Sequence, residues 1–82
     1  MAIVISDTEA KANLAANLNR MLKQRELRQA ELARMIGEHQ SLVSRISNGR
    51  NMPGGAVLAR IAEALDVSID RLLSPPPEEI PA

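Results

Sequence analysis

Residues 29–50 read QAELARMIGEHQSLVSRISNGR, and this stretch decides the fold. The apolar residues of its first part recur at helical spacing and predict a helix over residues 29–36. Gly37 marks the end of that helix, because glycine accepts the positive φ angle that commonly closes a helix. A second helix is expected from residue 40 to residue 48, after a turn of only three residues.

The short turn sets the two helices at a wide angle, so that the second protrudes while the first supports it. Ala33 is small because the second helix crosses the first at that point, and Val43 and Ile46 are the inner positions of the second helix. An ordinary helical hairpin without a ligand has the same spacing as a DNA-binding pair of helices. The spacing alone therefore leaves both alternatives open.

Three further helices are expected outside this stretch. Residues 6–9 (SDTE) match a capping box that opens a first helix ending near residues 24–26. A fourth helix is expected over residues 56–65, and Ser68 can cap a short fifth helix. In the first helix Leu14, Leu18, Met21, Leu22 and Arg25 recur at helical spacing and form one stripe, and Asn13, Asn17, Arg20 and Lys23 fall mostly off it.

The predicted fold class is thus all-α, with five short helices in one domain. We expect an N-terminal extension over residues 1–6, a helix-turn-helix domain over residues 7–74 and a Pro-rich tail over residues 75–82. The chain of 82 residues contains no Phe, Trp or Tyr. Methionine is therefore expected to fill gaps in the core, at positions Met21, Met35 and Met52.

Composition excludes several kinds of site. Without aromatic rings the chain cannot stack single-stranded bases or build an aromatic cage. Without Cys and with a single His it has no thiolate or histidine metal site, and we find no catalytic constellation. No apolar run is long enough to span a membrane, and no signal peptide is evident. We expect a cytoplasmic protein that is not an enzyme and uses no cofactor or metal.

Charge is unevenly distributed although the net charge is zero. Residues 20–50 contain seven basic and three acidic side chains, which gives +4. Residues 1–19 carry −1 and residues 51–82 carry −3. A binding face needs local rather than global charge, so the basic middle is compatible with DNA binding and also with a solvated helical surface.

The residues 29–37 and 41–50, together with the pattern LxxIAxALxVSxDxLL at 58–73, resemble the lambda-repressor/Cro-like (XRE-type) helix-turn-helix DNA-binding family. The resemblance covers about residues 14–73, and its motifs occur in the expected order and register. It implies a five-helix domain whose third helix enters the major groove of double-stranded DNA.

The resemblance also implies a role for particular residues. The base contacts it implies are Gln40, Ser41, Leu42, Ser44 and Arg45. The phosphate contacts it implies are Arg28, Gln29, His39, Asn48 and Arg50. In this family the residue at position 29 also braces the first residue of the recognition helix, which is Gln40 here.

Three positions depart from the family pattern. His39 and Arg28 replace the usual Ser or Thr caps of the two helices, and either side chain can reach a phosphate instead. Leu42 stands where small polar residues are common. It can pack against thymine methyl groups or cover a neighbouring part of the protein.

The leading hypothesis is a sequence-specific transcriptional regulator that represses as a homodimer on a palindromic operator. An alternative is an antitoxin that binds DNA and neutralises a toxin protein through a terminal segment. A third possibility is a protein-docking module, which the outward Arg28, Arg45 and Arg50 disfavour.

Two segments are candidates for the dimer contact: the fifth helix, with Ile69, Leu72 and Leu73, and the segment Met1–Ile5. Alternatively, Ile69 and Leu72 complete the core of the monomer and only Leu73 is left over.

Overall fold

The computed structural model describes residues 6–77, which contain five helices and no strand. The helices are α1 (Asp7–Gln24), α2 (Gln29–Ile36), α3 (Gln40–Ser47), α4 (Gly55–Leu65) and α5 (Ile69–Leu73). The all-α prediction is confirmed, and the helix bounds differ from the expected ones by one residue at the end of α3 and the start of α4. The segment Met1–Ile5, one of the two proposed dimer contacts, lies outside the described residues.

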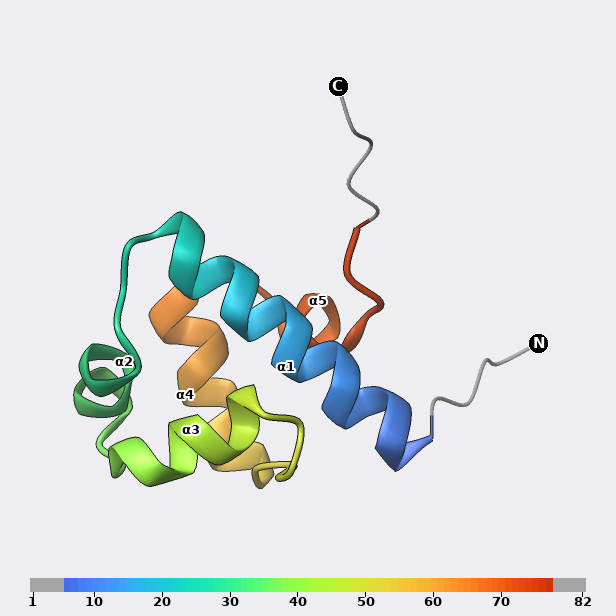
Figure 1. Ribbon diagram of the computed structural model, residues 1–82, viewed down its shortest axis with the longest axis horizontal. Helices are drawn as coiled ribbons and strands as arrows, with labels where there is room; N and C mark the ends of the chain where they lie inside the picture. Colours follow the sequence, from blue (N-terminus) through green and yellow to red (C-terminus); the bar gives the residue numbers. More distant parts are fainter. Residues whose placement is uncertain (1–5, 78–82) are drawn as a thin grey trace.

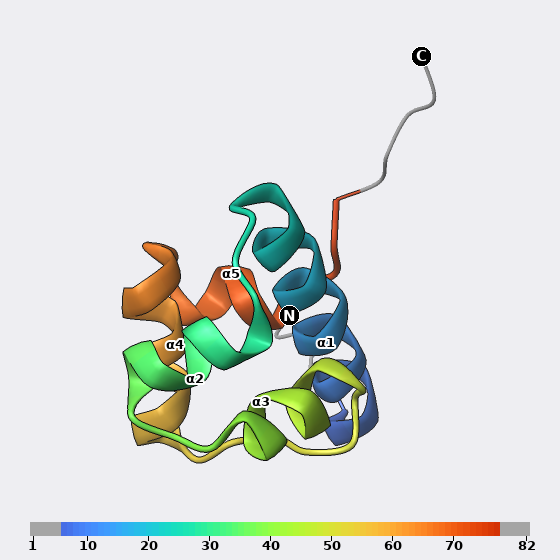
Figure 2. The ribbon, with the colours of Figure 1, turned by 60° about the vertical axis from the view of Figure 1, so that its left-hand side comes forward.

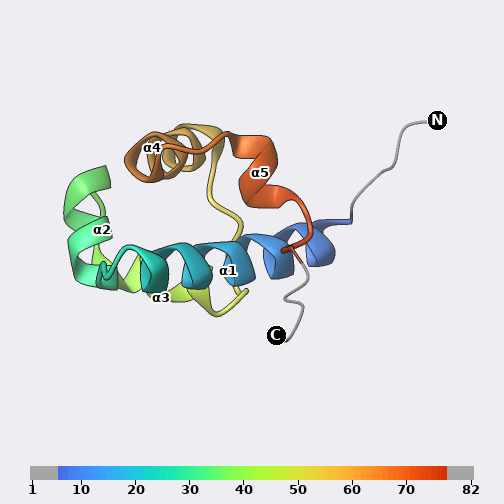
Figure 3. The ribbon, with the colours of Figure 1, turned by 90° about the horizontal axis from the view of Figure 1, so that it is seen from above.

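The five helices form two layers. Viewed from above, α4 and α5 lie over α1 and α3, and α2 closes one end (Figure 3). α1 crosses the length of the molecule and contacts both α3 and α5, while α2 packs against α3 and α4 (Figure 1). α3 thereby lies along one edge of the molecule, supported by α1 and α2. No helix of residues 6–77 is both long and apolar enough to cross a membrane.

One apolar core joins all five helices. Its buried residues are Leu14, Leu18, Met21, Leu22, Leu32, Ala33, Ile36, Val43, Ile46, Leu58, Ile61, Ala62, Leu65 and Leu72. Met21 fills the core and Met52 packs against it, as expected for a protein without aromatic residues. The expectation for Met35 is wrong, because its side chain is 54% exposed. The buried face of α2 consists of Leu32, Ala33 and Ile36, and Met35 lies outside it.

Asn17 corrects the interpretation of α1, since this residue belongs to the buried stripe rather than lying off it. Its side chain is 1% exposed, and its amide nitrogen lies 2.8 Å from the carbonyl oxygen of Leu72 and 2.7 Å from that of Ser74. The last carbonyls of a helix lack partners within the helix. The Asn17 amide donates to these carbonyls, and α5 is thereby bonded to α1.

Four helices end in the same hydrogen-bonded turn. The residue that follows the positive-φ position donates its backbone N–H to a carbonyl of the last turn, as Glu38 N–H does to the carbonyl of Ala33 at 2.9 Å. Such a turn needs one residue with a positive φ angle. Glycine occupies that position after α2 and α3, but Glu26 (φ 53°) and Asp66 (φ 56°) occupy it after α1 and α4.

The short helix α5 divides its apolar residues differently from the expectation. Ser68 caps it by accepting from the Arg71 N–H at 3.1 Å, as predicted. Leu72 is buried and Leu73 packs against the core, whereas Ile69 is 37% exposed. The alternative in which Ile69 and Leu72 complete the core and only Leu73 is left over is therefore wrong. Ile69 sits directly after the cap, on the outer side of the first turn, and it is the apolar residue of α5 that meets the solvent.

Candidate nucleic-acid interface

The two sides of α3 differ sharply in burial. Val43, Ile46 and Ser47 are buried against the rest of the domain. Gln40, Ser41 and Arg45 on the other side are exposed, and Ser44 is half-buried. Figure 2 shows α3 at the edge of the molecule beside α2, with its outer side unobstructed by the other helices. The structure therefore gathers four of the five expected base contacts on one accessible face.

Leu42, the fifth, is in a different position. Its side chain is half-buried and packs against the core cluster. Two roles are expected for Leu42: packing against thymine methyl groups or covering a neighbouring part of the protein. The contact with the core favours the second role.

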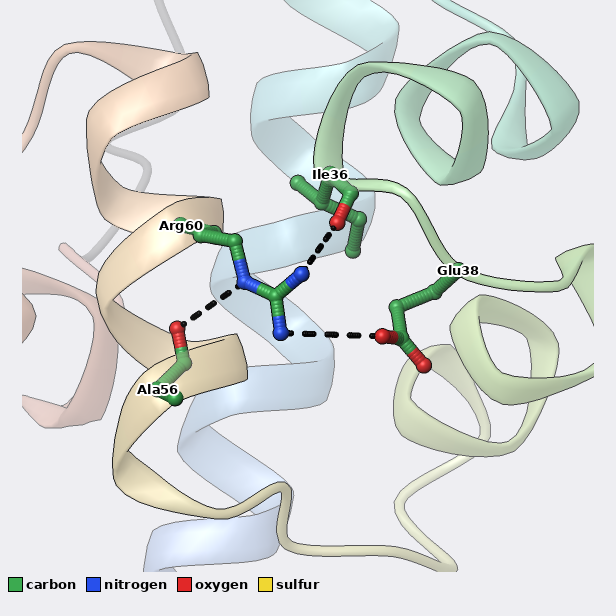
Figure 4. A network of polar contacts seen from close by, with 4 residues as sticks. All are labelled: Ile36, Glu38, Ala56 and Arg60. Atoms are coloured by element: carbon green, nitrogen blue, oxygen red, sulfur yellow. Dashed lines mark hydrogen bonds and ion pairs between the residues drawn. The ribbon is translucent and has the colours of Figure 1, made fainter.

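The turn between α2 and α3 is bonded to α4 through Arg60. The guanidinium donates to the carbonyl oxygen of Ile36 at 2.8 Å, and its other nitrogen lies 3.6 Å from a carboxylate oxygen of Glu38 (Figure 4). Its Nε also donates to Ala56 O at 3.4 Å, within α4. Arg60 was not among the expected site residues. No spacing in the sequence links it to the turn, which lies more than twenty residues earlier.

Ser47 holds the other end of α3. Its hydroxyl accepts from Gln29 Nε2 at 2.9 Å and donates to the carbonyl of Ser44 at 2.9 Å. Its own carbonyl accepts from Asn19 Nδ2 at 2.9 Å, which bonds α3 to α1. Ser47 was not among the site residues expected from the sequence, because it is polar. Its spacing from Val43, four positions earlier, already placed it on the inner face.

The bracing role implied for Gln29 is therefore corrected. Gln29 bonds to Ser47 near the end of α3, and no hydrogen bond within residues 6–77 joins it to Gln40 at the start. The reason is geometric: Gln29 opens α2, and the crossing of the two helices brings that end of α2 to the last turn of α3. Gln29 is half-buried, so part of its side chain still reaches the surface.

The remaining expected phosphate contacts flank α3. Arg28 and His39 precede α2 and α3, and neither side chain makes a capping hydrogen bond. Asn48 and Arg50 follow α3 directly. All four residues are exposed. Their donors thus lie at both ends of the recognition helix, where a DNA backbone on either side of a groove would pass.

Acidic side chains near this face are engaged elsewhere. α3 itself contains no Asp or Glu. Glu31 accepts from the Arg28 backbone N–H at 3.1 Å, and Glu38 lies beside Arg60. Of the basic side chains of residues 20–50, Arg28, Arg45 and Arg50 are exposed on α3 or beside it, and an anionic polymer is attracted there.

Comparison with known proteins identifies this arrangement. A family model described as helix-turn-helix matches residues 18–72, most of the chain. The chain belongs to the lambda-repressor-like helix-turn-helix family. Members of this family bind double-stranded DNA, so the fold is that of a DNA-binding transcription regulator.

Two solved structures share the fold of this helix-turn-helix protein. A hypothetical transcription factor, NHTF, from Neisseria has a TM-score of 0.79 and 29% identity, over 93% of this chain and 85% of that one. A solution structure of the SOS-response transcriptional repressor LexA from Eubacterium rectale has a TM-score of 0.78 and 20% identity, over 98% of this chain and 86% of that one. A search of curated proteins found no match.

Proposed function

We propose that this protein is a sequence-specific regulator that represses transcription by binding a palindromic operator as a homodimer. The observation that carries the proposal is the outer face of α3. It presents Gln40, Ser41 and Arg45 to the solvent and contains no acidic residue, while hydrogen bonds fix the helix at both ends.

These side chains suit the edges of bases in the major groove. Arg45 has the donor fork that binds O6 and N7 of guanine, and Gln40 can bind N6 and N7 of adenine with both groups of its amide. Ser41 and Ser44 can donate to or accept from a base edge. Arg45 lies four positions after Ser41, on the same face of α3, so that the contacts follow each other along the groove.

The exposed donors at the ends of α3 complement the phosphates. His39 serves the start of α3, Asn48 and Arg50 serve its end, and Gln29, bonded to Ser47, brings Arg28 toward that same end. Phosphate contacts release counterions, so binding should weaken as salt increases.

The dimer follows from the size of the site. One recognition helix of eight residues reads only a few base pairs, which is too few to select an operator. Two copies on half-sites about 34 Å apart, one turn of DNA, would place both helices in successive major grooves on one side of the duplex.

Fluorescence anisotropy with a labelled duplex from the region upstream of the gene tests the proposal. A duplex of the same composition in scrambled order is the control. We expect the native duplex to bind about a thousandfold more tightly than the scrambled one. Because a few phosphate contacts release counterions, we also expect its affinity to fall clearly when the salt concentration is raised from about 50 to about 200 mM. Equal affinity for the two duplexes, or an affinity that salt does not change, would contradict the proposal. A reporter gene behind the same region distinguishes repression from activation.

A further inference from the structure

A surface cavity of about 230 Å³ lies on the side of the domain formed by α1, α5 and the start of the tail. Its lining consists of Asn17, Arg20, Arg71, Ser74, Pro75 and Pro77. None of these residues belongs to α2 or α3, so the cavity is separate from the proposed DNA-binding face.

Two arginines line this cavity. Arg20 comes from α1 and Arg71 from α5, and among residues 6–77 no carboxylate lines the cavity. Like charges in one small cavity repel each other, and the repulsion is relieved when an anion lies between them. The ion pair that the structure shows within residues 6–77 joins Arg60 and Glu38, on another part of the domain.

Arg20 has an unsatisfied donor. Within residues 6–77 its Nε is buried and has no hydrogen-bond partner, while its Nη2 makes a long contact of 3.4 Å with Oδ1 of Asn17. A buried N–H without a partner costs free energy, and in native proteins such groups usually have a partner. Because this Nε is buried, a ligand in the cavity would bond to the outer nitrogens of the guanidinium, for which a carboxylate is a strong acceptor.

The other walls limit what can bind. The amide nitrogen of Asn17 is already committed to the carbonyls at the end of α5. Pro75 and Pro77 add apolar ring surface. The volume is below the range of about 300–1,000 Å³ that is usual for larger ligands. The fitting ligand is thus small, with one anionic head and a short apolar part.

We propose that this cavity binds a small aliphatic carboxylate, with its oxygens on the guanidinium groups of Arg20 and Arg71 and its carbon chain against Pro75 and Pro77. This site goes beyond DNA binding and stands independently of it. Because the ligand would bridge α1, α5 and the first tail residues, its binding should also stabilise the packing of α5.

The test is an NMR titration of the full chain that follows the Nε–H signal of the Arg20 side chain. Sodium butyrate is the probe, and chloride keeps the ionic strength constant. We expect a saturable shift of this signal. Arg71→Gln should weaken binding by about tenfold, because one charge-assisted pair is lost. Arg34→Gln, an exposed arginine of α2 outside the cavity, is the matched control and should leave the titration unchanged.

Three results would overturn the proposal. One is a shift that never saturates, or one that Arg71→Gln and Arg34→Gln change equally. Another is that inorganic phosphate binds as tightly as butyrate, which would mean that Pro75 and Pro77 contribute nothing to binding. The third concerns Glu78 and Glu79, which follow the cavity residues in the sequence. If butyrate binds only after both are changed to Gln, a carboxylate of the chain itself is the occupant and no external ligand is needed.

Discussion

The guanidinium of Arg60, in the middle of α4, donates a hydrogen bond of 2.8 Å to the carbonyl oxygen of Ile36, the last residue of α2. The carbonyls at the end of a helix need partners from outside it. Arg60 provides one and lies beside Glu38 in the same turn. The turn that directs α3 outward is therefore fixed by a helix that does not belong to the helix-turn-helix pair.

Arg60→Met tests this bond, because methionine keeps the apolar stem and removes every donor. We expect the free energy of unfolding to fall by about 1 kcal/mol, measured by urea denaturation. Glu38→Gln is the control. It removes only a solvated ion pair at 3.6 Å and should cost less than about 0.5 kcal/mol. Equal effects of the two changes would mean that the bond to Ile36 contributes nothing.

Gly37→Ala tests the left-handed turn after α2. The φ angle of Gly37 is +72°, and an added Cβ would meet nothing closer than the Arg60 Nη1 at 3.8 Å, so the cost is one of backbone conformation. We expect a loss of about 1 kcal/mol. Gly55→Ala, at the first residue of α4, has open space and no positive φ angle, and it should not lower the melting temperature. Conversely, Glu26→Gly should stabilise the protein by about 1 kcal/mol, because Glu26 occupies the same left-handed conformation with a side chain. An unaltered melting temperature for Gly37→Ala would show that the turn tolerates alanine.

Asn17→Asp preserves the shape of a buried side chain and removes its N–H donors. The carboxylate would face the carbonyl oxygens of Leu72 and Ser74, which now accept from the amide. We expect a loss of about 2–3 kcal/mol in urea denaturation at neutral pH. Asn13→Asp removes one hydrogen bond, to Leu73 O at 2.9 Å, at a half-buried position and should cost about 1 kcal/mol. The reverse order of the two losses would be incompatible with the burial of Asn17.

Arg45→Ala and Arg50→Ala separate base reading from phosphate binding. Replacing Arg45 should cost about 1–3 kcal/mol per half-site and should relax the preference at one base position. Replacing Arg50 should weaken binding to all sequences by a similar factor and lower the salt dependence. Both are measured by anisotropy against a set of single-base variants of the operator. If both changes weaken all duplexes equally, α3 is not the reading element.

Ile69→Glu tests the contact between two copies. Ile69 is the exposed apolar residue of α5, so a charged side chain should be tolerated in the monomer and should disrupt an interface formed there. We expect sedimentation at micromolar concentration to show a monomer for Ile69→Glu and a dimer for the unaltered chain. A dimer that survives this change but not deletion of residues 1–5 would move the interface to the N-terminal segment. If the unaltered chain is already monomeric without DNA, the two copies associate only on the operator.

The sequence by itself determined the five helices, their order and the outward face of α3. These features depend on local rules: apolar residues at helical spacing, Ser6 and Ser68 as caps, and Gly37 as a stop. Each rule involves residues within one or two turns of each other. The exposed positions Gln40, Ser41 and Arg45 followed from the same spacing, since Val43 and Ile46 had to face inward.

Only the tertiary structure decided which polar residues the core would bury and which groups would hold the site. Asn17, Asn19 and Arg60 donate to carbonyls that lie between 24 and 57 residues away in the chain. Helix packing sets such pairs, and a polar residue at an inner position looks like a surface residue until its acceptor is known. Met35 and Ile69 show the converse: both are apolar, and both remain exposed. Periodicity assigns a residue to a face of its helix, but whether that face is covered depends on the other helices.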